Sequence, residues 1–175
     1  LIFIIFMRFS RTYKVVKILS LIFDLTQYNN LYKIRLFNIL MKYKFLSHTA
    51  DVKFKAYGKT LNESFENSAL AMFNLMYNGK VKSIKKLDFS VKGKDIDNLL
   101  YNFLEELLIL LDSKNFFISR AKVKIDKKNM SLKTVLHGDK SSNYQLGLGV
   151  KAVTYNEMFV KKVSDKWVCQ VVLDV

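Results

Sequence analysis

The amino-acid sequence predicts an α+β fold in which two α-helices pack on one face of a mainly antiparallel β-sheet. Two segments between residues 60 and 111 have the three- and four-residue apolar spacing of amphipathic helices, and strand-like segments dominate the chain after residue 115. We expect residues 41–175 to form this domain, because a chain of 175 residues can bury a proper core and still carry an appendage.

Residues 43–57 predict a strand, a turn and a second strand. In the second strand, apolar and polar side chains alternate with a period of two, and Gly58 follows as a break. The alternating residues are Val52, Phe54 and Ala56 on one face and Lys53, Lys55 and Tyr57 on the other.

The first predicted helix begins at a capping box formed by Thr60 and Glu63, and Gly79 is its predicted stop. Its apolar positions are Leu61, Phe65, Ala69, Met72, Phe73 and Met76. A short strand is predicted over residues 87–91. Asp95 is the predicted cap of a second helix, in which Glu105 and Glu106 interrupt a broad apolar face rich in leucine.

Three or four strands are predicted in the second half of the domain. They cover residues 116–125, 130–136, 149–160 and 167–173, and the predicted turns contain Gly138, Gly147 and Gly149. The single cysteine, Cys169, has no partner for an internal disulfide, which fits a reducing cytoplasm. We expect it to be a small apolar residue of the core in a terminal strand.

Residues 1–40 differ from the rest of the chain, with six basic residues against one acid. Their apolar stretches are shorter than the ~20 residues that span a bilayer, and the basic residues follow the first apolar run instead of preceding it as in a signal peptide. An amphipathic helix lying on a membrane surface, over residues 13–23, is one interpretation. The favoured one is an upstream translation or a poorly ordered extension, with Met41 as the natural start.

The net charge of +14 and the pI near 9.7 favour a polyanionic partner such as RNA. Two observations weaken this inference. Only four of the 29 basic residues are arginine, and the abundance of Lys, Ile, Asn, Phe and Tyr is typical of a biased genome.

His48 and Asp51, three residues apart, have three interpretations: an acid/base couple, a metal ligand supported by an imidazole, or a carboxylate that stabilises a turn. Asp174 is equally ambiguous, because an acid near a C-terminus is usually solvated. The sequence has no zinc-ligand spacing, nucleophile elbow, phosphate-binding glycine loop or dinucleotide fingerprint. If a metal binds, its oxygen donors suit Ca²⁺ or Mg²⁺.

Five segments carry a specific combination of motifs. They are residues 43–52 with His48-Thr49-Ala50-Asp51, residues 56–66, residues 99–107, residues 150–155 with Lys-Ala-Val-Thr-Tyr, and residues 172–175, Val-Leu-Asp-Val. In this order and spacing they resemble the archease family, and the resemblance covers residues 41–175.

The resemblance implies a non-catalytic activator of the RtcB-type RNA-splicing ligase, which joins tRNA exon halves and acts in RNA repair. Archeases promote guanylylation of the ligase and its multiple turnover, so tRNA would be met through the ligase. A divalent cation, Ca²⁺ with Mg²⁺ as the alternative, would be held by Asp51, Asp174 and a main-chain or terminal oxygen of Val175.

Other residues of the motifs have a functional and a plain interpretation. His48 would support the metal site. Lys151 would contact the ligase or a phosphate, or is an ordinary exposed strand lysine. Glu105 or Glu106 would extend the acidic site, or lies on a solvated helix edge.

The sequence departs from the family at two positions. Asn156 stands where many relatives have His, which puts any proton transfer at this position in doubt. Asp139 stands where Glu is frequent, and keeps the charge on a shorter side chain. Two rival functions stay open: a direct tRNA-binding module or chaperone with a lysine-rich surface, and a hydrolase that uses His48 and Asp51.

Overall fold

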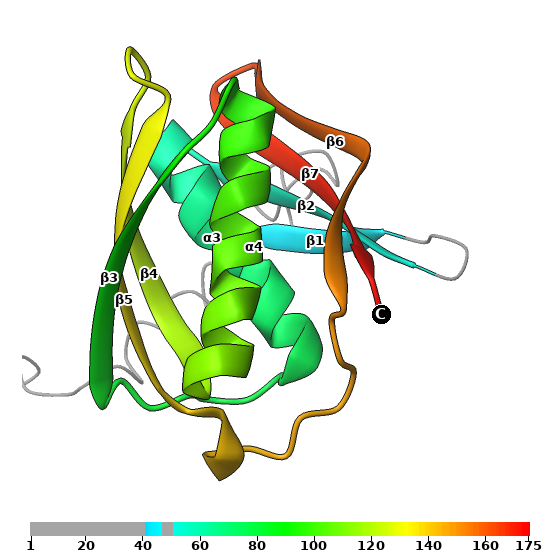
Figure 1. Cartoon of the computed structure of the whole chain (residues 1–175). Helices are drawn as coiled ribbons and strands as arrows, with labels where there is room; N and C mark the ends of the chain where they lie inside the picture. The colour runs from blue at the N-terminus through cyan, green and yellow to red at the C-terminus, as the bar shows by residue number, and fades with distance from the viewer. Residues whose placement is uncertain (1–40, 47–50) are drawn as a thin grey trace, which may run out of the picture. The chain divides into compact units, whose positions relative to one another are not determined.

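A computed structural model describes residues 41–46 and 51–175 of the chain. Lys42–Val175 forms one compact unit, and the interpretations of residues 1–40 lie outside the described residues. Its seven strands form two antiparallel sheets (Figure 1). Sheet A has the spatial order β1(Tyr43–Leu46), β2(Val52–Gly58), β7(Lys166–Asp174) and β6(Ala152–Val163). Sheet B has the order β3(Lys85–Lys92), β5(Ser131–Lys140) and β4(Phe116–Asp126), and a short 3₁₀-helix η2(Ser141–Asn143) follows β5.

Two helices, α3(Leu61–Met76) and α4(Ile96–Lys114), run between the two sheets, so each sheet has one face against a helix (Figure 1). The predicted α+β class, the antiparallel pairing and both helices are confirmed. The division of the strands into two sheets could not be foreseen from the alternation of residues, because that pattern gives the face of a strand and not its neighbour.

The helix starts agree with the sequence prediction in most details. The hydroxyl of Thr60 accepts a hydrogen bond from the N–H of Glu63 at 3.1 Å, and Asp95 accepts one from the N–H of Asn98 at 2.8 Å. The Glu63 carboxylate accepts from the N–H of Lys59 at 2.7 Å, one residue before the position that a standard capping box uses.

Two predicted glycine positions are wrong. Helix α3 ends at Met76 with Tyr77 in extended conformation, so Gly79 lies beyond the end of the helix and does not cap it. Gly138 lies inside β5, opposite Ile118, and not in a turn. A Cβ atom at position 138 would approach the carbonyl oxygen of Phe117 to 2.1 Å, so close backbone approach explains this glycine.

The hydrophobic core fills the space around the two helices. Phe73 of α3 packs edge-on against Phe117 of β4 at 4.9 Å between ring centroids, and Phe65 stacks on Phe103 of α4 at 6.1 Å. Cys169 of β7 is fully buried in this core, as predicted. Of the described residues, none belongs to a helix that is both long and apolar enough to span a bilayer.

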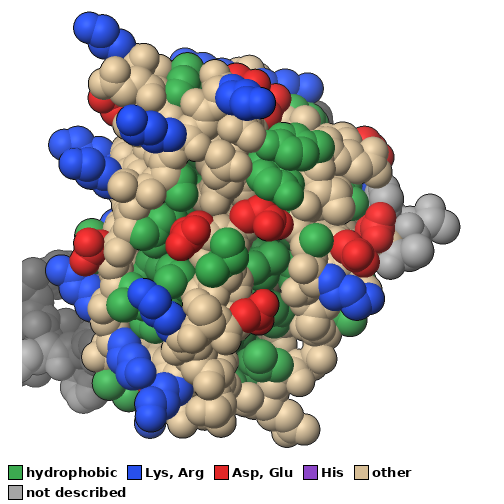
Figure 2. Space-filling view, viewed as in Figure 1, with side chains coloured by type: hydrophobic (Ala, Val, Ile, Leu, Met, Phe, Trp, Pro, Cys, Tyr) green, Lys and Arg blue, Asp and Glu red, His purple; other side chains and the backbone are tan. Residues whose placement is uncertain are grey.

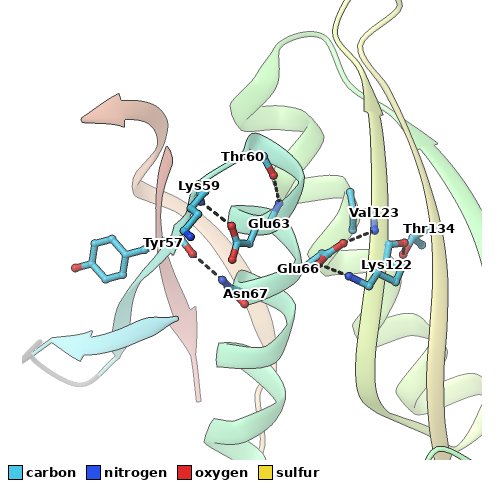
Figure 3. Close-up of polar contacts among 9 residues, drawn as sticks. All are labelled: Tyr57, Lys59, Thr60, Glu63, Glu66, Asn67, Lys122, Val123 and Thr134. Carbon is cyan, nitrogen blue, oxygen red and sulfur yellow. Dashed lines mark hydrogen bonds and ion pairs between the residues drawn. The ribbon is translucent and has the colours of Figure 1, made fainter. Parts of the chain in front are cut away.

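Side chains of the two helices satisfy backbone donors of the edge strands β4 and β6. On α3, a carboxylate oxygen of Glu66 accepts from the N–H of Val123 at 3.0 Å (Figure 3). The side-chain oxygen of Asn62 accepts from the N–H of Ile125 at 3.1 Å. On α4, Asp97 accepts from the N–H of Val160 at 2.7 Å, and Glu105 accepts from Val153 at 3.0 Å. Edge-strand donors that would otherwise invite pairing with another chain are therefore occupied.

We expect Glu66→Ala to lower the free energy of unfolding by about 1–3 kcal/mol, because it leaves the partly buried N–H of Val123 without an acceptor. Glu66→Gln keeps a carbonyl acceptor and should recover most of the loss. It gives up only the 3.4 Å ion pair with Lys122, whose side chain is 62% exposed. Urea unfolding of both variants tests this, and equal losses would contradict the assignment.

Burial raises the pKa of the Cys169 thiol to about 12, against a weaker opposite effect of hydrogen bonds with Ser64 and Ser68. We therefore expect native Cys169 to resist alkylation by iodoacetamide near neutral pH, and to react readily once guanidinium chloride unfolds the chain. Mass spectrometry of the alkylated protein measures both rates. Fast modification of the native protein would show that this region of the core opens.

Candidate metal and partner site

Strands β2 and β7 bring the two predicted carboxylate ligands to one end of sheet A. Val52 pairs with Leu173 in the antiparallel ladder, so Asp51 and Asp174 occupy the next step on either side. Both residues are half-buried. The pairing therefore brings together two acids that are more than 120 residues apart in the sequence.

Lys151 joins the same end of the sheet from the loop before β6. Its backbone N–H donates to the carbonyl oxygen of Asp174 at 2.9 Å, and its ammonium group donates to the main-chain oxygen of Val175 at 2.8 Å. The structure thus gives this lysine two partners within the last two residues of the chain. Its ammonium positive charge lies at one of the oxygens predicted to hold a cation.

Glu105 approaches this end from α4, where it accepts a hydrogen bond from Val153, two residues beyond Lys151. It therefore fixes the start of β6 whether or not it also faces a ligand. Glu106 follows it on α4 and is half-buried. His48, the predicted support of the metal site, lies outside the described residues.

The donors at this end fit a hard divalent cation in their chemistry. Asp51 and Asp174 supply carboxylate oxygens and Val175 a main-chain oxygen, and such donors suit Ca²⁺ or Mg²⁺. Among the described residues, no group of three or more His, Cys, Asp and Glu side chains is arranged to hold a metal ion. Further ligands would have to come from main-chain oxygens, water or a partner.

Strand β6 contains a large irregular bulge that the sequence analysis missed. Thr154 pairs with Val172 and Phe159 with Gln170, so residues 155–158 lie opposite a single residue of β7. Glu157 has a left-handed backbone with φ 49°. Its carboxylate accepts from the Lys53 ammonium at 3.0 Å, and its carbonyl oxygen accepts from the side-chain amide of Gln170 at 2.8 Å.

The bulge displays Tyr155 and Asn156 at the surface. The ring of Tyr155 stacks on that of Tyr101 of α4, with 4.1 Å between centroids and 9° between planes, and its hydroxyl accepts from the amide of Asn98. Asn156, the first of the two expected departures from the family pattern, is exposed. The only sequence signal for the bulge was the Glu-containing polar run inside an apolar strand.

Asp139, the second departure from the family pattern, is buried and has a structural role. It accepts hydrogen bonds from the Asn143 side chain, the Tyr144 hydroxyl and the N–H of Lys140 at 3.1, 2.8 and 2.8 Å. These bonds, with Asn143 the largest contributor, lower the pKa of its carboxyl group. Asp139 thus ties η2 to β5 and shapes the loop that leads to Lys151.

The chain matches several known proteins over the part that contains this site. Residues 43–175 match the model of the Archease protein family. A protein named archease from Sulfurisphaera tokodaii is 36% identical over 139 residues, which cover 78% of this chain and all of the relative. Another from Methanosarcina acetivorans is 38% identical over 140 residues, covering 77% of this chain and 96% of the relative.

Two solved structures are also similar. The solution structure of Methanobacterium thermoautotrophicum protein 1598 is 34% identical, with a TM-score of 0.66 and coverage of 77% of this chain and 99% of that protein. A Thermotoga maritima structure, described as an archease and possible chaperone, is 18% identical, with a TM-score of 0.53 and coverage of 75% and 96%, and it supports the fold alone. On its sequence and its fold, this chain belongs to the archease family.

Proposed function

We propose that this protein is a non-catalytic activator of an RtcB-type RNA-splicing ligase, promoting its guanylylation and multiple turnover in tRNA exon ligation and RNA repair. Membership of the archease family supports the proposal. The observation that carries it is the pairing of Val52 with Leu173, which sets Asp51 and Asp174 at one end of sheet A.

In this proposal Asp51, Asp174 and the main-chain oxygen of Val175 hold a divalent cation, Ca²⁺ or Mg²⁺. When bound, the cation supplies positive charge that links these oxygens to acidic or phosphate groups of the ligase. Lys151 adds an ammonium group at the same place and keeps the final residues against β6. These residues attract and position groups of the ligase, and the ligase performs the covalent chemistry.

We propose that the protein acts in the cytoplasm. The free, buried thiol of Cys169 is compatible with that reducing compartment. The rival hydrolase requires His48 to act with Asp51. It would show itself as substrate turnover by the isolated protein, with a pH profile that His48→Ala abolishes.

We expect Asp51→Asn and Asp174→Asn each to reduce the stimulation of ligase guanylylation by about tenfold, because each replaces a charged oxygen donor by a neutral one. The measurement is transfer of labelled GMP to the ligase with and without this protein. Asp165→Asn is a matched control, since it removes the same charge at the opposite, hairpin end of β6 and β7. If both site variants stimulate ligase guanylylation as fully as the wild-type protein does, the proposed metal site is wrong.

The same site predicts stabilisation by metal in the absence of the ligase. Added Ca²⁺ should raise the Tm of the wild-type protein in a concentration-dependent way, since a ligand that binds only the folded state stabilises it by mass action. Chelator should reverse the shift, and Asp51→Asn and Asp174→Asn should remove it. An equal shift in all three proteins would place the ion elsewhere.

A further inference from the structure

The outer face of sheet B carries an array of basic side chains. One face of this sheet packs on the helices through residues such as Phe89, Leu132 and Val123, and the alternate residues point away from the core. We call this outward array the basic face. Its basic residues are Lys86 and Lys92 of β3, Arg120, Lys122 and Lys124 of β4, and Lys133 of β5, all of them exposed.

The strand register sets these charges side by side across the sheet. Lys124 pairs directly with Lys133, which pairs with Ser90, and Lys86 and Arg120 lie on either side of His137. Like charges directly opposite in an antiparallel pair destabilise the sheet. A fold without an anionic partner would gain from alternating the signs at these positions.

Acidic residues are scarce on the basic face. Asp88 is the one acid in the middle rows, and Asp126, at the end of β4, accepts hydrogen bonds from its own turn, including that of the Asn129 side chain at 2.8 Å. Glu66, on α3, forms an ion pair with one residue of the basic face, Lys122. Most of the charge on this face is therefore not neutralised within the sheet.

Compositional bias alone does not explain the basic face. A chain that gains lysine at random would place it in helices too, since lysine is a good helix former. Helix α3 has no lysine or arginine, and α4 has one lysine against four acids. In Figure 2 the acidic side chains lie across the middle of the view, where α4 runs in Figure 1, and basic side chains gather at the side of β3.

We propose that the basic face binds the phosphate backbone of a structured RNA such as tRNA. The rows of the array are about 7 Å apart along the strands, so the face spans roughly 20 Å, a length over which a duplex presents on the order of ten phosphates. None of its side chains is Phe, Tyr or Trp, and base stacking needs such rings. We therefore expect the basic face to contact phosphates and to show little preference for the nucleotide sequence.

The phosphate contact rests on the charges of the basic face alone, whereas the choice of RNA over another polyanion rests on the proposed function. An anionic membrane is the less favoured partner. Besides charge, surface binding to a bilayer uses apolar or aromatic residues that enter the headgroup layer, and the middle of this face offers only the half-buried Val135.

The test is binding of the full chain to a labelled tRNA transcript, measured by fluorescence anisotropy without the ligase. The face variant combines Arg120→Gln, Lys124→Gln and Lys133→Gln. The control variant combines Lys80→Gln, Lys94→Gln and Lys114→Gln, which removes the same charge from exposed positions off the sheet. We expect the face variant to bind at least about tenfold more weakly, and to lower the slope of log K against log salt by about two to three.

Equal losses in the two variants, or no binding of the wild-type protein at low salt, would overturn the proposal. So would loss of binding to phosphatidylserine vesicles in the face variant with tRNA binding kept. The face variant should keep its Tm or raise it, because it removes the repulsion between Lys124 and Lys133. A normal Tm then separates lost binding from lost folding. Guanylylation measured without tRNA should be normal in the face variant, so failure here and failure of the proposed function are distinguishable.

Discussion

The two sheets depend on hydrogen bonds that helix side chains accept from the edge strands. Glu66 of α3 occupies a donor of β4, and Asp97 and Glu105 of α4 occupy donors of β6. An open edge exposes donors and acceptors that favour pairing with another chain. Because the helices lie between the sheets, each can cover an edge as well as a face, and a short chain can keep two separate sheets.

These contacts have an electrostatic consequence. Burial is the main cause of the raised pKa of Asp97, while the hydrogen bond from Val160 acts in the opposite sense. Because the pKa is raised in the folded state, Asp97 contributes less stability as pH rises above the ordinary range of a carboxyl group. The structure thus uses several of its few acids as partly buried acceptors on the helices. Fewer remain to balance the lysines of the outer strands.

Local patterns predicted the elements well, and the sequence could not predict their arrangement. Thr60 and Asp95 identify the helix starts because a helix cap involves only about four neighbouring residues. The apolar neighbours of Cys169 likewise predict its place in the core. Gly138 reads as a turn because the sequence does not show that another strand's carbonyl lies against its Cα atom. The bulge at residues 155–158 is held by contacts of Glu157 with Lys53 and Gln170. These contacts join residues that are distant in the sequence, so local patterns could not predict them.

The candidate site has the same limit. The sequence spacing of Asp51 and Asp174 does not show that the two residues lie close together. Before the structure, only the resemblance to a family suggested this. The register of β2 and β7 brings the two residues to the same end of the sheet. The position of Lys151 adds a feature that neither source gave. Its side chain is held by a main-chain oxygen of the residue after Asp174, so the loop before β6 and the end of β7 are joined by a charged hydrogen bond.

The two proposed surfaces belong to different sheets. The acids and Lys151 lie at one end of sheet A, and the basic face is the outer side of sheet B, with α3 and α4 between the sheets (Figure 1). Neither surface shares a side chain with the other. The charges differ as well: the first surface carries two carboxylates and the Lys151 ammonium group, whereas the second is mainly lysine and arginine side chains. In our two proposals, the ligase is bound at one end of the protein and an RNA backbone on its side.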